Sequence, residues 1–174
     1  MSSKEKCALE IERKYIIEMP DVAILLKEEK YSSSEILQIY LPSEQGMTHR
    51  IRRRIFQDRT QYTETVKLRV DKMSSEEREG ELSAEQFTHL SINIKEGTRP
   101  LNKTRHTFLY LGQLFEIDIY PEWHHTAIME TELSSRETQV KMPEFIRIIK
   151  EVTGDKAYSN ASMSREFPKE ETQS

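Results

Sequence analysis

The chain has 174 residues, of which 36% are hydrophobic and 32% are charged, and residues 1–174 are long enough to form a single domain with a sizeable core. Thirty acids nearly balance 26 bases to give a net charge of −4, which argues against a general nucleic-acid-binding protein because such proteins are normally basic. The single cysteine, Cys7, excludes an intramolecular disulfide, and no apolar run approaches the roughly 20 residues that cross a bilayer.

Three segments show helical patterns, in contrast to the rest of the chain, where short strands are expected. Residues 21–29 predict a short helix, and Ser83 with Gln86 forms a capping box that opens a helix carrying Phe87, Leu90 and Ile94. Apolar residues of 143–152 recur at helical spacing, and Gly154 would end that helix. The polar residues 166–174 are expected to form a loose tail.

The predicted strands carry charge on their polar face, repeated at positions i and i+2. Seven segments show this alternation, with eight acids and eight bases in total: Glu10, Glu12 and Lys14; Arg50, Arg52 and Arg54; Lys67 and Arg69; Glu79 and Glu81; Lys103 and Arg105; Glu116 and Asp118; Glu130 and Glu132. Two architectures satisfy the pattern. One is a sandwich with its charges outside, and the other is a closed barrel with a charged interior and an apolar outer face covered by the predicted helices 83–94 and 143–152. Periodicity alone does not choose between them.

The order of the charged motifs resembles the CYTH superfamily, which is named for class IV adenylyl cyclase and thiamine triphosphatase. The resemblance covers residues 8 to about 163 and rests on an ExExK motif, RxR, TxK and KxR strands, later acidic strands and a closing segment, in that order: Glu10–Lys14, Arg50–Arg52, Thr65–Lys67, Glu79–Glu81, Lys103–Arg105, Phe115–Asp118, Glu130–Glu132 and Asp155–Asn160. It implies a mainly β fold, a closed eight-stranded antiparallel barrel that forms a triphosphate tunnel with a few flanking helices.

The same resemblance implies an Mg²⁺- or Mn²⁺-dependent enzyme acting on a small-molecule triphosphate. The motif spacing is most similar to that of the bacterial inorganic triphosphatases, which split tripolyphosphate into pyrophosphate and phosphate. A class IV adenylyl cyclase, a thiamine triphosphatase and a non-catalytic polyphosphate or nucleotide sensor are the alternatives. We expect a cytoplasmic protein that can form a homodimer and that has neither nucleic acid nor a membrane as a partner.

Inward-pointing bases would hold the triphosphate, and inward-pointing acids would hold the metal. The expected phosphate ligands are Lys14, Arg50, Arg52, Lys67, Lys103 and Arg105, because converging cations and arginine forks suit phosphate oxygens. The expected metal ligands are Glu10, Glu12, Glu79, Glu81, Asp118, Glu130 and Glu132, which offer the hard oxygen atoms that Mg²⁺ and Mn²⁺ prefer.

Lys67 and Tyr40 are the expected catalytic residues. Neighbouring cations are expected to lower the pKa of Lys67 and so make it a base for the attacking water, with Glu81 or Asp118 as alternatives. Tyr40 would hydrogen-bond a phosphate or serve as an ordinary strand aromatic.

Glu77, His106 and Ala157 depart from the family pattern. Glu77 stands where an arginine is usual, His106 where a tyrosine is common and Ala157 where a basic residue is typical. Neither a metal role for the adjacent His124 and His125 nor a nucleophilic role for Cys7 is expected.

Overall fold

The structure of the protein is a computed structural model that describes residues 6–171, with side chains from Glu10 onward. The side chain of Cys7 therefore lies outside the described residues. The described residues form nine strands and a few short helices. The strands are β1 (Lys6–Glu18), β2 (Glu29–Leu41), β3 (Met47–Phe56), β4 (Arg59–Arg69), β5 (Ser74–Glu81), β6 (Leu101–Tyr110), β7 (Gln113–Ile119), β8 (Thr126–Glu132) and β9 (Ile148–Glu151).

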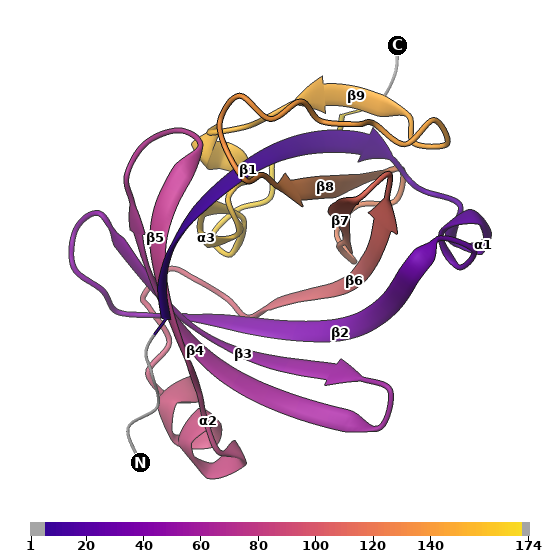
Figure 1. Ribbon diagram of the computed structural model, residues 1–174. Helices are drawn as coiled ribbons and strands as arrows, with labels where there is room; N and C mark the ends of the chain where they lie inside the picture. Colours follow the sequence, from indigo (N-terminus) through magenta and orange to yellow (C-terminus); the bar gives the residue numbers. More distant parts are fainter. Residues whose placement is uncertain (1–5, 172–174) are drawn as a thin grey trace.

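Eight antiparallel strands close into a barrel, so the closed-barrel prediction is confirmed and the sandwich is excluded (Figure 1). The sheet runs β5-β4-β3-β2-β6-β7-β8-β1, and β1 closes the ring by also pairing with β5. One half of β1 lies against β5, while the other half, Glu12–Glu18, lies against β8. The same long strand therefore provides both sides of the closure.

The alternation of the strands sends apolar side chains outward over much of the barrel, where other segments cover them. Phe108, Phe115 and Ile117 pack with Ile146 on one side. Helix α2 (Ala84–Ser91) covers another side by placing Phe87 against a cluster that includes Ile39, Leu41 and Ile51. This arrangement leaves the polar faces of the strands to line the interior.

One end of the barrel interior is filled by an apolar plug. Inward positions of the strands become apolar there, with Leu101, Tyr120 and Ile128 packed against Tyr158 and Met163. The last two residues belong to a 3₁₀ turn, η1 (Lys156–Tyr158), and to α3 (Asn160–Met163), and Figure 1 shows α3 within the outline of the ring. The charged part of the interior is thus capped by the C-terminal segment.

Two of the three predicted helices form. The expected capping box is present, since Ser83 Oγ accepts from the Gln86 amide and Gln86 Oε1 accepts from the Ser83 amide, and α2 ends at Ser91 rather than at Ile94. The segment 21–29 contains only one helical turn, α1 (Val22–Leu25), which Asp21 caps.

The prediction of a helix over 143–152 is wrong. Residues Ile148–Glu151 form β9, which pairs with β1 from Tyr15 to Ile17. The β-branched Ile148 and Ile149 suit a strand, and pairing with an available edge outweighs a local helical period. The barrel is consequently covered on this side by a strand and by loop residues rather than by a second helix.

The expected loose tail is wrong for residues 166–171, because they pack on the barrel. Phe167 stacks edge-on against Trp123, whose indole N–H donates to the Pro168 carbonyl (3.2 Å). One oxygen of Glu170 accepts the amide hydrogens of residues 124–126 at 2.5–2.9 Å. Among residues 6–171, no helix is long and apolar enough to span a membrane.

Candidate functional site

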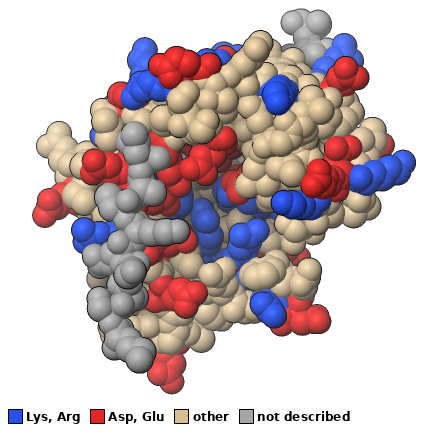
Figure 2. Space-filling view, in the orientation of Figure 1, with Lys and Arg blue, Asp and Glu red and all other residues tan. Residues whose placement is uncertain are grey.

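A cavity of about 380 Å³ occupies the charged part of the barrel interior. Seven bases and nine acids line it: Lys14, Arg50, Arg52, Lys67, Arg69, Lys72 and Arg105, and Glu10, Glu12, Asp71, Glu77, Glu79, Glu116, Glu130, Glu132 and Asp155. Figure 2 shows Lys and Arg side chains within a hollow and Asp and Glu side chains beside them. Such a cavity is suited to a multiply charged small molecule.

Most of the expected site residues meet in this cavity. Five expected phosphate ligands, five expected metal ligands and one expected catalytic tyrosine line it: Lys14, Arg50, Arg52, Lys67 and Arg105; Glu10, Glu12, Glu79, Glu130 and Glu132; and Tyr40. Three expected residues do not line it. Lys103 and Asp118 are buried in the wall, and Glu81 is exposed at the end of β5.

The buried carboxylate of Asp118 holds two cations in place. Its Oδ2 accepts from Lys103 Nζ (2.6 Å) and from Arg105 Nη2 (2.8 Å), and its Oδ1 accepts from Arg105 Nε (2.7 Å). Burial raises the pKa of Asp118, but the charges of Arg105 and Lys103 outweigh burial and hold this pKa well below its usual range. Both oxygens are therefore occupied, which fits a residue that positions Arg105 better than a metal ligand or a base.

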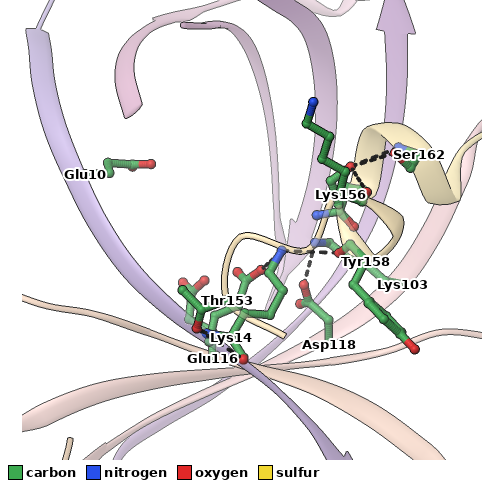
Figure 3. Close-up of polar contacts among 12 residues, drawn as sticks. Glu10, Lys14, Lys103, Glu116, Asp118, Thr153, Lys156, Tyr158 and Ser162 are labelled. Atoms are coloured by element: carbon green, nitrogen blue, oxygen red, sulfur yellow. Dashed lines mark hydrogen bonds and ion pairs between the residues drawn. The ribbon is translucent and has the colours of Figure 1, made fainter. Parts of the chain in front are cut away.

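Lys14 joins the first strand to the C-terminal segment that caps the barrel. Its Nζ lies 2.8 Å from Glu130 and donates to the Tyr158 carbonyl (3.3 Å), while its backbone amide donates to Thr153 (3.0 Å). Figure 3 shows Lys14 with Thr153 and Tyr158, and Lys103 with Asp118, whereas Glu10 lies well away from this group. The cavity thus has two separate clusters of charge.

The second cluster, around Lys67, overturns the expectation of a lowered lysine pKa. Lys67 Nζ lies 3.0 Å from Glu10 and 3.5 Å from Glu77, which also pairs with Arg50 at 2.9 Å. Burial lowers the pKa of Lys67, but the charges of Glu12, Glu10 and Glu77 outweigh burial and raise it. Lys67 is consequently a charged ammonium group, suited to binding an anion rather than to accepting a proton.

The guanidinium of Arg52 is held by a side-chain amide rather than by a carboxylate. Its Nε and Nη2 both donate to Gln38 Oε1, and Gln38 Nε2 donates to the Tyr40 hydroxyl (2.8 Å). Burial, together with the charges of Arg50 and Arg105, lowers the pKa of Arg52 to about 9. No carboxylate partner of Arg52 is found among residues 6–171, so its guanidinium is available to an incoming anion.

Three acids on β1 and β8 form a site that a cation would stabilise. Glu12 lies opposite Glu132 in the strand register, and Lys14 lies opposite Glu130. The negative charge of Glu130, followed by burial, raises the pKa of Glu12, which shows that these carboxylates repel one another. Their hard oxygen atoms fit Mg²⁺ or Mn²⁺. Among the residues that the structure describes, no three acids, histidines or cysteines already converge at metal-binding distance.

Sequence reasoning gave no site role to Gln38, which is buried and holds Arg52, or to Glu77, which lines the cavity. Gln38 lies two residues before Tyr40 on β2, so strand alternation alone places both side chains on the inner face. Glu77 precedes Glu79 by two residues on β5 and follows the same rule. His106, which departs from the family pattern, lies outside the cavity lining and bonds the Tyr31 hydroxyl through Nδ1 (2.9 Å). His124 and His125 are exposed and do not line the cavity.

Comparisons with solved structures support the architecture. The chain is 25% identical to the inorganic triphosphatase NE1496 with a TM-score of 0.56, and the match covers 97% of this chain and 99% of that one. A second structure of NE1496, described as a hypothetical protein, gives 26% identity, a TM-score of 0.56 and coverage of 91% and 99%. The PH1819 protein from Pyrococcus horikoshii OT3 shares the fold at 21% identity and a TM-score of 0.54, over 74% of this chain and 80% of that one. No family model and no curated protein matches the sequence.

Proposed function

We propose that this protein is an enzyme that hydrolyses triphosphates, with inorganic tripolyphosphate as its preferred substrate. The closed barrel supports this proposal, because it is the fold that the resemblance to the CYTH superfamily implies. The observation that carries the proposal is the convergence of Lys14, Arg50, Arg52, Lys67 and Arg105 on one enclosed cavity that also holds repelling carboxylates. Cations alone would suit many anions. Cations beside clustered acids suit an anion that arrives with a divalent metal.

Arg50 and Arg52 are the proposed first contacts of the triphosphate. The Nε of Arg50 is buried and has no hydrogen-bond partner among the described residues, so an entering phosphate oxygen would satisfy it. Arg52 would exchange or share its contact with Gln38 for a second phosphate oxygen. Arginine forks bind such oxygens in pairs, which fixes the orientation of the chain of phosphates.

Glu12, Glu130 and Glu132 are the proposed ligands for Mg²⁺ or Mn²⁺. When bound, the metal would neutralise charge on phosphate oxygens and help to orient the attacking water. Glu79 has a weaker claim to this role because the register of β5 places it opposite Lys6, at the start of β1, and because it accepts the Thr65 hydroxyl (3.0 Å). Asp118, whose oxygens are taken by Arg105 and Lys103, and the exposed Glu81 are not included in the proposed set.

The proposed reaction is an in-line displacement at a terminal phosphorus atom. A water oxygen forms a bond to that phosphorus, the bridging P–O bond breaks, and pyrophosphate leaves with the electron pair. Lys67 as an ammonium group, with Arg50 and Arg52, would stabilise the charge that develops on the phosphoryl oxygens. Burial raises the pKa of Tyr40, so its phenol stays neutral and can donate a hydrogen bond.

A lining carboxylate is a better candidate than Lys67 for accepting the proton of the water. Burial and the nearby Glu77 raise the pKa of Glu10 to about 7, and a group with a pKa near the working pH is the most effective general base. Glu10 also lies beside Lys67, at 3.0 Å, and so faces the same phosphate. Glu10 would therefore accept the proton, which is the role first expected of Lys67, and the charged Lys67 would bind the phosphate.

The inorganic substrate is preferred because NE1496, to which the chain is similar over nearly its whole length, is described as an inorganic triphosphatase. The apolar plug closes one end of the interior, so any nucleoside or thiamine group would have to lie toward the other end. The test is a panel of tripolyphosphate, ATP and thiamine triphosphate with Mg²⁺ or Mn²⁺, assayed for phosphate, pyrophosphate and cyclic AMP.

Phosphate release that is fastest from tripolyphosphate supports the proposal. Cyclic AMP from ATP would establish the cyclase alternative instead, and tight binding without turnover of any substrate would establish a sensor. Arg52→Ala serves as the site variant, and we expect a loss in kcat/KM of about 10²-fold from removing one charged phosphate contact.

A further inference from the structure

Glu77 occupies the position in the cavity where a substrate phosphate would meet two of its cations. The side chain of Glu77 is only 10% exposed, and its carboxylate contacts Arg50 Nη2 at 2.9 Å and Lys67 Nζ at 3.5 Å. Those two bases come from neighbouring strands, β3 and β4, whose side chains Glu77 bridges from β5. A phosphate that binds Arg50 and Lys67 must therefore displace or tolerate a fixed negative charge.

Acidic side chains also outnumber basic side chains in the cavity as a whole. Its nine lining acids outnumber its seven lining bases. A tripolyphosphate without metal carries about four to five negative charges at neutral pH, because each phosphate group is largely ionised. A cavity with more acids than bases opposes such an anion, and the opposition is stronger than in bulk water because the protein walls have a low dielectric constant. Divalent cations that arrive bound to the substrate would remove this electrostatic opposition.

We propose that Glu77 is a specificity-determining residue that makes the cavity select the metal-complexed triphosphate over the free anion. The proposal rests on the proposed function and deepens it. Glu77 competes with the phosphates for Arg50 and Lys67, so binding is favourable only when a divalent cation compensates both the substrate and the displaced carboxylate. A site that rejects the free anion differs from a simple cationic cradle, in which metal is needed for chemistry but not for binding.

A purely structural role of Glu77 gives the opposite expectation. If the carboxylate served only to hold Arg50 and Lys67 in place, its removal would disorder these bases and weaken binding with or without metal. If it competes with phosphate, its removal strengthens binding of the free anion. The sign of the change in affinity without metal therefore separates the two roles.

The test is isothermal titration of tripolyphosphate into the full chain, once with EDTA and once with a saturating concentration of Ca²⁺ or Mg²⁺ under conditions of slow turnover. The variants are Glu77→Gln, which removes the charge and keeps the shape, and Glu77→Arg, which places the residue usual in the family. Glu76→Gln is the matched control, because Glu76 is the preceding residue of β5, is exposed and is not among the lining residues. It changes the net charge by the same amount outside the cavity.

We expect Glu77→Gln to bind tripolyphosphate at least about tenfold more tightly than the parent protein in EDTA, with a much smaller difference in the presence of metal. Glu77→Arg should show a larger gain, and Glu76→Gln should show no change. Unchanged or weaker binding by both folded Glu77 variants in EDTA, or an equal gain by Glu76→Gln, would overturn the proposal. If no variant binds tripolyphosphate even with metal, the proposed function itself fails, and that result is distinct from a failure of the role of Glu77.

Discussion

The replacement Asp118→Asn tests whether this acid acts as a support of the cavity wall. In the structure, Asp118 accepts three hydrogen bonds of 2.6–2.8 Å from Lys103 and Arg105, and the side chains of Asp118 and Lys103 are 1% and 0% exposed. An asparagine at this position keeps the size of the side chain but leaves the buried Lys103 without its carboxylate partner, whereas Arg105 keeps its contacts with Glu116 and Glu130.

The expected loss in the free energy of unfolding is large. Removing one member of a buried ion pair costs about 3–5 kcal/mol, because the remaining charge is left desolvated and unpaired. For a protein of this size, 1 kcal/mol corresponds to roughly 2–4 °C in Tm, so Tm should fall by roughly 6–20 °C. An exposed pair gives a contrasting control. Glu18 lies 3.6 Å from Arg147, with side chains 36% and 70% exposed, and Glu18→Gln should cost less than about 1 kcal/mol.

Urea unfolding followed by circular dichroism measures both variants against the parent protein. A second substitution, Lys103→Met in the Asp118→Asn background, should recover part of the lost stability, because it removes the buried charge that Asp118 had paired. A loss below about 1 kcal/mol in Asp118→Asn, or no recovery in the double variant, would show that the buried network does not support the wall as we infer.

Three further outcomes are expected. Arg52→Ala should weaken binding of metal-complexed tripolyphosphate by about tenfold or more in titration calorimetry, whereas Arg54→Ala should change it little, because Arg54 donates to Ser34 and does not line the cavity. Glu170→Gln should lower the free energy of unfolding by about 1 kcal/mol in urea titrations, because a charged acceptor of several amide hydrogens becomes neutral; an unchanged value would mean that the tail contributes nothing. Burial raises the pKa of Glu130, but the charges of Lys14, Arg105 and Lys103 together outweigh it, so that this pKa falls from 4.5 to about 2. The resulting stability is complete above pH 4.5 and is lost as the pH falls toward 2, and Glu130→Gln should make the acid unfolding curve shallower in that range.

Strand alternation predicts much of the cavity lining from the sequence. The period of two places Glu10, Glu12 and Lys14 on one face, and the structure turns that face inward, as it does for Arg50 and Arg52. The choice between a barrel and a sandwich could not come from the period, because both architectures satisfy it. The ordered motifs made that choice, since they resemble a family whose barrel is closed.

Features that depend on pairing in three dimensions were beyond the sequence pattern. Residues 148–151 have a helical period, but the free edge of β1 makes them a strand. The pKa of Lys67 follows its contacts with Glu10 and Glu77, which lie on β1 and β5, and a sequence shows only that cations lie nearby along β4. The burial of Asp118 likewise depends on which acid of an alternating pair lies deepest in the wall.

The double pairing of β1 has a consequence for the order of folding. The strand synthesised first finds one partner in β5 and the other in β8, where Glu12 pairs with Glu132 across more than two thirds of the chain. Contacts so distant in sequence form slowly, because a long loop must close before they provide any stabilisation. On the ribosome, the hairpins β2–β3, β3–β4, β4–β5 and β6–β7 can form early, but the ring stays open until β8 emerges. The charged interior is therefore exposed to solvent until late in synthesis, and its many charged side chains help to keep the open sheet from associating with other chains.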